Sequence, residues 1–422
     1  MTALWRLWRI SWRNIFRNTR RTLLTLMILI LGGIGLILVG GFFLSQQERL
    51  GVAYIYSQSG HMVINKKGFY THGQLDPSAY LMDGVEKLTT QIEHTPHVAF
   101  TAPRLFSEGM LSSDSNSASV LAMGVIPSRE KMMFENKYFD GAPSSLIVEG
   151  EQLSSEDPYG IIIGEPLQKS MGLHVGDSVS FITQQKEGVI DGADFHVRGV
   201  FRTNMKEVGE RSIKIPLPTL QLILKAPDQA HSILVLLDDT ANTDSLVATL
   251  GKELNSQEDR FELIPWYKQG TLHAQTKKFL NGIYRVVQVI ISIIFFFSIA
   301  NTMNMALLER MREYGTMMAM GNNRSIIFKM ILMESFFLGV IGSAMGICLG
   351  YLLTQIVSHA GIPMPPPPLV ADNVDWIKIT LLPTPRLLAE SFSLTFLATL
   401  ISALFPAYRA SHTQIIHALG YT

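Results

Sequence analysis

The chain has 422 residues, of which 47% are hydrophobic and only 17% are charged, and its 35 basic and 35 acidic residues cancel. Soluble domains carry roughly 25% charged residues and nucleic-acid binders carry a basic excess, so the composition argues against both classes. The apolar content excludes a disordered chain, and the single cysteine, Cys348, excludes an intrachain disulfide framework.

The first 22 residues predict a helix that lies in the cytoplasmic headgroup layer. Trp5, Trp8, Trp12 and Phe16 recur at steps of three and four, and Arg9, Arg13 and Arg17 follow another face. This pattern is typical of an interfacial amphipathic helix with its aromatic face inward. A plain topology signal remains an alternative. We expect a retained anchor rather than a cleaved signal peptide, because the apolar run that follows is too long and lacks an A-x-A-like site.

Four apolar segments predict four transmembrane helices, one before and three after a large polar region. Each contains the run of about 20 apolar residues that crosses a bilayer. The predicted spans are 23–45, 277–308, 330–357 and 387–408. Five glycines in the first span predict that it packs closely on another helix. Glu334, near the start of the third span, is expected near the cytoplasmic boundary, within reach of water, as a structural or coupling residue.

Basic residues predict the orientation. They gather in 1–22, between the second and third spans, and after the fourth span at Arg409, which makes both termini cytoplasmic. Residues 46–276 hold 19 basic and 29 acidic residues, a net charge of −10, and the rest of the chain holds 35 − 19 = 16 basic and 35 − 29 = 6 acidic residues, a net of +10. The neutral total is therefore the sum of an acidic external domain and basic cytoplasmic anchors.

The external region 46–276 predicts a mixed α/β domain. We expect strands at 61–64, 120–125, 160–163, 178–182, 195–201, 213–215 and 232–237, and helices at 84–94, 165–171, 218–224 and 243–254. The second external segment, 358–386, is proline-rich and predicts a rigid extended strut, or alternatively a partner-binding segment. Residues 409–422 form a cytoplasmic tail.

Motifs that carry chemistry are missing from the sequence. There is no G-x-x-x-x-G-K-[ST] phosphate loop, no H-E-x-x-H zinc motif and no G-x-S-x-G elbow. We therefore expect no enzymatic activity, no cofactor and no metal in this chain.

Three ordered motifs resemble those of FtsX-like, MacB-type ABC transporter permeases. They are E-R-M-R-E-Y-G at 309–315 with A-M-G at 319–321, P-A-Y-R-A at 406–410, and the external pair I-I-I-G-E-P-L at 161–167 and G-L-H-V-G-D-S-V at 172–179. The resemblance spans nearly the whole chain and implies a separate ATPase subunit, which carries ATP and Mg. It also implies that 309–329 is the coupling helix. Glu309, Arg310, Arg312 and Glu313 would contact the ATPase, and Gly315 and Gly321 would allow close approach and a helix end. Without the resemblance, the charged residues of 309–329 favour a solvated connector with ordinary i,i+3 and i,i+4 pairs.

The resemblance further implies a permease subunit of the mechanotransmission type in the bacterial inner membrane. It would pair with a second permease chain, identical or paralogous, and move lipoproteins or another amphiphile from the inner membrane or periplasm toward the outer membrane. The resemblance also implies a central cargo seam between the two chains, lined by apolar side chains of the first and second spans, and helical spacing predicts Phe43, Val287, Ile291 and Phe295 as its residues.

A periplasmic carrier or adaptor is the remaining implied partner. In the lipoprotein-releasing permeases a hook loop captures the carrier, whereas the corresponding connection here, 183–193, is short and has no proline. Lys186, Glu187 and Gly188 at its tip are the predicted contacts. Two alternatives stay open. One is a MacB-like exporter working with an adaptor, although MacB-type chains carry a fused ATPase that this sequence lacks. The other is an FtsX-like regulator of a cell-wall hydrolase, a group with a smaller external domain.

Overall fold

The computed structural model describes residues 8–9, 11–13, 17, 19–73, 77–134, 145–185, 187–203, 206–256, 258, 260–269, 271–361, 363–364, 377–378 and 380–412. The chain divides into a helical unit, 1–48 with 276–363 and 378–422, and an α/β unit, 49–275 with 364–377. The predicted fold class is confirmed, because four apolar helices flank an α/β domain inserted between the first and the second.

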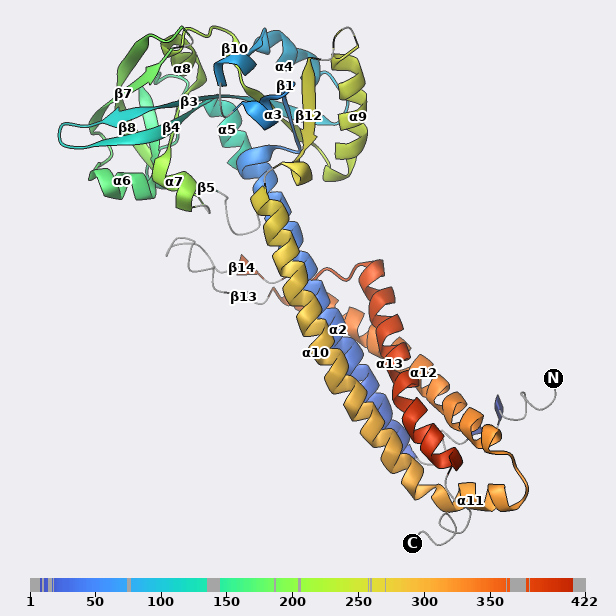
Figure 1. Ribbon diagram of the computed structural model, residues 1–422. Helices are drawn as coiled ribbons and strands as arrows, with labels where there is room; N and C mark the ends of the chain where they lie inside the picture. Colours follow the sequence, from blue (N-terminus) through green and yellow to red (C-terminus); the bar gives the residue numbers. More distant parts are fainter. Residues whose placement is uncertain are drawn as a thin grey trace. The chain divides into compact units, whose positions relative to one another are not determined.

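Four long helices form the helical unit (Figure 1). They are α2 (Thr19–Tyr54), α10 (Thr271–Glu309), α12 (Arg324–Ala360) and α13 (Pro385–His412), and each is long and apolar enough to cross a membrane. The chain is therefore a multi-pass membrane protein. All four helices extend beyond the predicted spans at both ends. The predicted spans stop near charged residues, whereas the hydrogen bonds of a helix continue through charged residues.

Glycines bring α2 and α12 into close contact. A Cβ atom added to Gly33 would lie 3.3 Å from the Cα atom of Gly346, and one added to Gly346 would lie 3.2 Å from the backbone of Ile30. Gly342 and Gly350, one turn to either side of Gly346, face Leu29 and Ile37 in the same way. The prediction that the first span packs on another helix is confirmed, since small residues allow helix backbones to approach.

Hydroxyl side chains line the contact between α12 and α13. Thr395 Oγ1 donates to Ser343 Oγ at 2.9 Å, and it also bonds the carbonyl of Ser391 one turn back. In the next turn, Thr399 Oγ1 donates in the same way to the backbone carbonyl of Thr395 at 2.8 Å. All of these side chains are buried, and their hydrogen bonds satisfy polar groups that would be costly inside a bilayer.

The N-terminal segment packs on α12 at its described positions. The rings of Trp8 and Trp12 lie 5.0 and 5.2 Å from the ring of Phe337, and the fully buried Ser11 donates to the carbonyl of Met330 at 3.3 Å. The predicted inward aromatic face is thus covered in part by protein. Arg9 and Arg13 are exposed, and the remaining aromatic positions, Trp5 and Phe16, lie outside the described residues.

The α/β unit has one large sheet, a small two-stranded sheet of β2 and β10, and several helices. Its strands are β1 (Met62–Lys66), β2 (Met82–Asp83), β3 (Val98–Ser112), β4 (Ser117–Val125), β5 (Ser145–Gly150), β6 (Gly160–Gly164), β7 (Ser178–Gln184), β8 (Ile190–Thr203), β9 (Ser212–Pro216), β10 (Gln229–Ala230), β11 (Ser232–Leu237) and β12 (Phe261–Pro265). Its helices are α3 (Phe69–His72), α4 (Val85–Glu93), α5 (Pro127–Phe134), α6 (Glu165–Met171), α7 (Lys206–Arg211), α8 (Leu217–Ile223) and α9 (Thr243–Leu254).

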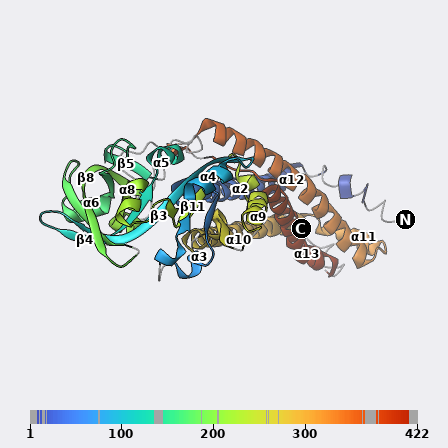
Figure 2. The same cartoon turned by 90° about the horizontal axis from the view of Figure 1, so that it is seen from above.

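The long strand β3 belongs to two lobes with separate cores (Figure 2). Its first half pairs with β11, β11 pairs with β1, and β1 pairs with β12. These strands pack with α4 and α9 around Ile64, Ile92 and Leu250. Its second half joins a barrel that closes on itself in the order β3-β4-β9-β6-β8-β7-β3. Phe181 lies fully buried inside this barrel, and α6 and α8 add Leu167 and Leu220 to the same core.

All of the predicted strands and helices of this unit are present, and several agree to the residue. The prediction missed β3, because Pro103 and Gly109 interrupt its alternation and proline is uncommon inside a paired strand. It also missed α5, β5 and β12, and the shorter elements α3, α7, β2 and β10. Within the predicted strut, 362, 365–376 and 379 lie outside the described residues. The described part holds the end of α12, the short strands β13 (Pro363–Met364) and β14 (Ile377–Lys378), and the segment 380–384 that leads into α13. The described part of the tail, 409–412, continues α13.

A buried charge cluster lies at the junction of the two lobes. Glu130 of α5 is bonded by both Arg104 of β3 and Lys214 of β9, and all three side chains are less than 10% exposed. Burial opposes ionisation of Glu130, yet the two cations hold the pKa of its carboxyl below its usual range. The cluster therefore ties the shared strand to a helix and to the barrel wall.

Two buried histidines predict a pH-dependent stability for the α/β unit. Burial lowers the pKa of His61 and of His231 from 6.5 to about 4, and each Nδ1 accepts a backbone N–H, from Leu237 and from Phe106. Above pH 6.5 both are neutral whether the chain is folded or unfolded. Between pH 6.5 and about 4 only the unfolded chain takes up protons, so stability falls as pH falls, by at most about 3 kcal/mol per histidine.

Scanning calorimetry of the purified chain at a series of pH values from 7.5 to 4.5 measures this effect. Replacing His61 and His231 by glutamine should flatten the decline above pH 4.5, and the exposed His72→Gln should not. An unchanged slope in the double variant would contradict the assignment.

Candidate functional site

A short amphipathic helix, α11 (Met311–Ala319), follows α10 directly and lies across the end of the helical unit (Figure 1). One face is buried: Met311, Tyr314 and Met318 pack with residues of α12 and α13 around Ile327 and Ala407. Tyr314 and Met318 are therefore core positions of the helical unit. The apolar face holds α11 on the bundle and leaves the opposite face free.

The free face of α11 carries charged and apolar side chains together. Arg312 and Thr316 of α11 are exposed one helical turn apart. The flanking residues are exposed too: Glu309 is the last residue of α10, and Met320, just after α11, has 70% of its surface exposed. Exposed Arg324 continues the face at the start of α12. An exposed methionine with charges on either side of it is typical of a helix that enters a groove of a partner protein.

Arg310 occupies a different position from the one predicted. Its side chain is 9% exposed, and Nη1 donates to Glu334 Oε2 at 2.9 Å while Nε donates to Glu313 Oε2 at 3.2 Å. Its guanidinium also covers the ring of Tyr314. The prediction that Glu334 would reach water is wrong as well, because the carboxylate bonds to Arg310 inside the protein and is only 7% exposed.

The predicted coupling helix 309–329 is shorter in the structure, because α11 ends at Ala319. Gly321 adopts a left-handed φ of +87°, and its N–H bonds the carbonyl of Met318 while the N–H of Asn322 bonds that of Met317. This pair of bonds is a Schellman motif, which ends a helix. Gly321 is thus the helix end that was predicted, residues 324–329 belong to α12, and Gly315 is buried in the packed face.

The predicted cargo seam falls on the side of α10 that packs within the chain. Phe295 is 4% exposed and its ring would meet a Cβ atom on Gly32 at 2.4 Å, so it cannot also line a seam with another chain in this arrangement. Val287 and Ile291 are half-buried, and Phe43 contacts the ring of Tyr284 at 5.7 Å. The neighbouring stripe of α10 is exposed instead: Val286, Val289, Ile290, Ile293, Ile294 and Phe297.

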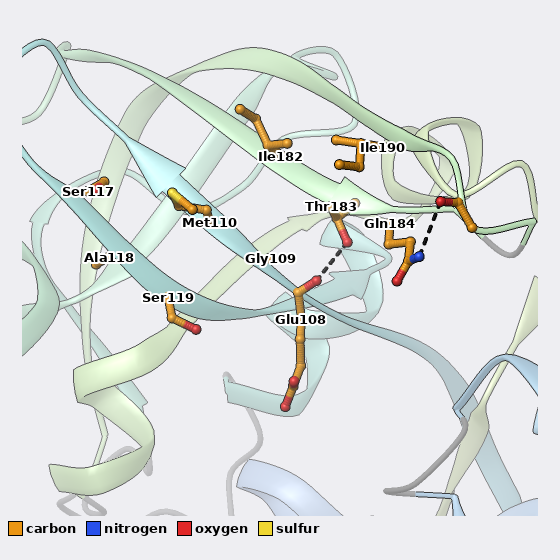
Figure 3. Close-up of a pocket in the computed structure, with 11 residues that line it drawn as sticks. Glu108, Gly109, Met110, Ser117, Ala118, Ser119, Ile182, Thr183, Gln184 and Ile190 are labelled. Atoms are coloured by element: carbon orange, nitrogen blue, oxygen red, sulfur yellow. Dashed lines mark hydrogen bonds between the residues drawn. The ribbon is translucent and has the colours of Figure 1, made fainter.

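A shallow groove of about 640 Å³ lies on the barrel, between the β3–β4 and β7–β8 hairpins (Figure 3). Met110, Ile182 and Ile190 line it and are 51%, 42% and 74% exposed. Thr183 Oγ1 donates to the carbonyl of Glu108 at 2.7 Å and holds the floor of the groove together. The groove therefore offers apolar side chains on a rigid, hydrogen-bonded frame.

Of the predicted carrier-contact residues, Gly188 lines this groove. Glu187 and Gly188 lie in the tight turn between β7 and β8, where Gln184 Nε2 donates to the carbonyl of Gly188 at 3.1 Å, and Lys186 lies outside the described residues. The connection between β7 and β8 runs only from Gln184 to Ile190, as short as the sequence indicates.

Sequence reasoning missed three functional candidates, namely the Arg310–Glu334 pair, exposed Met320 and the apolar groove residues Met110, Ile182 and Ile190. The pair joins positions 24 apart in the chain, and the groove joins strands from distant segments. A signal existed only for Ile182 and Ile190, two isoleucines that flank a polar turn in an otherwise alternating pattern.

Two family models match the chain, the MacB-like periplasmic core domain over residues 22–253 and the FtsX-like permease C-terminal domain over residues 285–415. LolC, the lipoprotein-releasing system transmembrane protein of Neisseria meningitidis serogroup B, is 22% identical over 78% of this chain and 80% of its own length. The macrolide export ATP-binding/permease protein MacB of Escherichia coli K12 is 22% identical over 81% of this chain and 52% of its own.

Among solved structures, the crystal structure of the periplasmic region of MacB from Actinobacillus actinomycetemcomitans is similar, with 15% identity, a TM-score of 0.37 and coverage of 50% of this chain and 92% of that one. The periplasmic-core match alone covers more than half of the 422 residues, and the permease match covers α12, α13 and most of α10. The chain therefore belongs to the family of FtsX-like permeases that carry a MacB-like periplasmic core domain.

Proposed function

We propose that this chain is the permease subunit of an ATP-driven ABC transporter, and that it moves lipoproteins or another amphiphile from the inner membrane or periplasm toward the outer membrane. The observation that carries the proposal is α11, a short helix fixed to the bundle by one face and exposed through Arg312 on the other, with the exposed residues Glu309 and Met320 at its two ends. A rigid helix of this kind can follow the movement of a partner and pass it to the helices on which it packs.

The partner of α11 is a separate ATPase subunit, which binds ATP and Mg. Basic residues near α11 and at both termini support a cytoplasmic location for this end of the helical unit. Residues 46–276, with their net charge of −10, then lie in the periplasm. A second permease chain, identical or paralogous, would cover the exposed apolar stripe of α10, and lipids would cover the rest.

The barrel groove is the proposed contact for a periplasmic carrier or adaptor. It stands beside the turn at Glu187 and Gly188 and exposes Met110, Ile182 and Ile190. The relative LolC supports a lipoprotein as cargo through its name. The short β7–β8 turn favours a reduced carrier contact, and for this reason an adaptor-dependent exporter of the MacB type remains the second candidate.

Replacing Met320 by aspartate is expected to weaken binding of the ATPase subunit by about tenfold or more, because the exposed anchor of the free face becomes a charge. Leu222, which is 72% exposed on the α/β unit, provides the matched control as Leu222→Asp. Affinity is measured by titrating the ATPase subunit against the purified permease in nanodiscs. Unchanged affinity in Met320→Asp would overturn the docking role of α11.

The same two variants test the cargo in cells that depend on this permease. With Met320→Asp, newly made lipoproteins should stay in the inner membrane, and with Leu222→Asp they should reach the outer membrane. Accumulation of a small amphiphile with normal lipoprotein sorting would favour the exporter. Normal distribution of both, together with altered cell-wall hydrolysis, would favour the regulator.

A further inference from the structure

The corner between α10 and α11 is a single residue, Arg310. Its backbone leaves the helical region at φ −106° and ψ 6°, which separates α10 from α11. Its N–H bonds the carbonyl of Leu307 at 3.1 Å, and its own carbonyl accepts the N–H of Tyr314 at 3.1 Å. The direction of α11 therefore depends on how this one residue is held.

The side chain of Arg310 is held by a third helix. Nη1 bonds Glu334 of α12 at 2.9 Å, and the two side chains are 9% and 7% exposed. A charge-assisted bond between buried groups is not weakened by water, and neither partner has a solvent alternative if they separate. Any rotation of α11 about its corner must move this guanidinium away from α12.

Glu313 extends the contact to α11 and to the N-terminal segment. Its Oε2 accepts from Arg310 Nε at 3.2 Å, and its Oε1 pairs with Arg17. Glu334, Arg310, Glu313 and Arg17 thus alternate in charge across four segments of the chain. We name these four residues the corner network.

We propose that Arg310 and Glu334 position α11, and that Arg310 acts inside the permease rather than on the ATPase. This inference rests on the proposed docking of the ATPase on α11. Movement of α11 then reaches α12 directly through the Arg310–Glu334 bond, in addition to reaching α10 through the backbone. The exposed residues Glu309, Arg312 and Met320 bind the partner, and the corner network keeps them at a constant angle to the bundle.

The variant Glu334→Gln tests this role because it keeps the size of the side chain and removes its charge. Spin labels at exposed Thr316 on α11 and Tyr408 on α13, in a Cys348→Ala background, report the orientation of α11 by double electron–electron resonance in nanodiscs. We expect a broadened distance distribution in Glu334→Gln and a narrow one in wild type. Glu390→Gln is the matched control, since Glu390 pairs with Arg386 on an exposed surface and should leave the distribution narrow.

Two functional readouts separate positioning from direct contact. Glu334→Gln and Arg310→Met should each keep ATPase affinity within about twofold of wild type, and should lower permease-stimulated ATP turnover by about tenfold. The exchanged pair Arg310→Glu with Glu334→Arg should narrow the distance distribution again and recover part of the turnover.

Three outcomes would overturn the inference. They are a narrow distribution with full turnover in Glu334→Gln, a loss of ATPase affinity in Arg310→Met as large as that in Met320→Asp, and no rescue by the exchanged pair. Failure of the proposed function looks different, because Met320→Asp would then leave ATPase affinity unchanged while the spin-label distances still respond to Glu334→Gln.

Discussion

Replacing Gly346 by leucine is expected to separate α2 from α12 and to lower the free energy of unfolding of the helical unit by about 3 kcal/mol or more. A Cβ atom alone would lie 3.2 Å from the backbone of both Leu29 and Ile30, closer than ordinary side-chain contacts, and the remaining three carbons of leucine have no space. Backbone cannot move aside as a flexible side chain can, so the whole helix must shift.

Gly35→Leu is the matched control, because it lies in the same apolar span of α2 and a Cβ atom there would meet nothing within 4 Å. Unfolding of both variants can be measured by titration with sodium dodecyl sulfate from mild detergent micelles. Equal loss of stability in the two variants would show that leucine is harmful in this span for reasons unrelated to the contact between Gly33 and Gly346.

Replacing Glu130 by glutamine is expected to lower the stability of the α/β unit by about 3 kcal/mol, because Arg104 and Lys214 would stay buried without a counter-charge. The folded pKa of Glu130 lies below its unfolded value, so its contribution is complete at neutral pH and is lost only as pH falls through the folded pKa. Calorimetry at pH 7.5 therefore measures the full effect.

Glu156, an exposed acid in the same unit, provides the control as Glu156→Gln, with an expected change within about 0.5 kcal/mol. A triple replacement of Arg104, Glu130 and Lys214 by methionine, leucine and methionine should recover stability relative to Glu130→Gln, because it removes the unpaired charges. If Glu130→Gln were as stable as Glu156→Gln, the cluster would contribute nothing at the lobe junction.

The apolar runs and the local patterns were enough to predict most elements of the fold. A span of about 20 apolar residues has one stable conformation in lipid, and alternation or helical spacing depends only on near neighbours. For this reason the four long helices and strands such as β6 and β11 could be predicted. Strand β3 could not, because its length comes from two different sets of partner strands that stabilise it despite Pro103.

The sequence predicted which segment forms the candidate site, but not which of its residues are exposed and which are buried. The motif at 309–315 drew attention to the corner, and glycine at 321 indicated its end. Which charges face outward was not predictable, since Arg310 and Arg312 are alike in sequence and differ only because Glu334 lies beside one of them. The burial of Phe295 was not predictable for the same reason, because its ring fills the space that glycine leaves at position 32 of another helix.

By itself, the sequence determined the membrane class, the number of spans, the expected orientation and the α/β insertion, because hydropathy and charge act locally and add along the chain. The tertiary structure alone decided which charged residues of the corner are buried, which face of α10 is open, and that a closed barrel and a second lobe share β3. These features depend on contacts between residues far apart in the chain, and a buried ion pair or a close helix crossing exists only after the helices have packed.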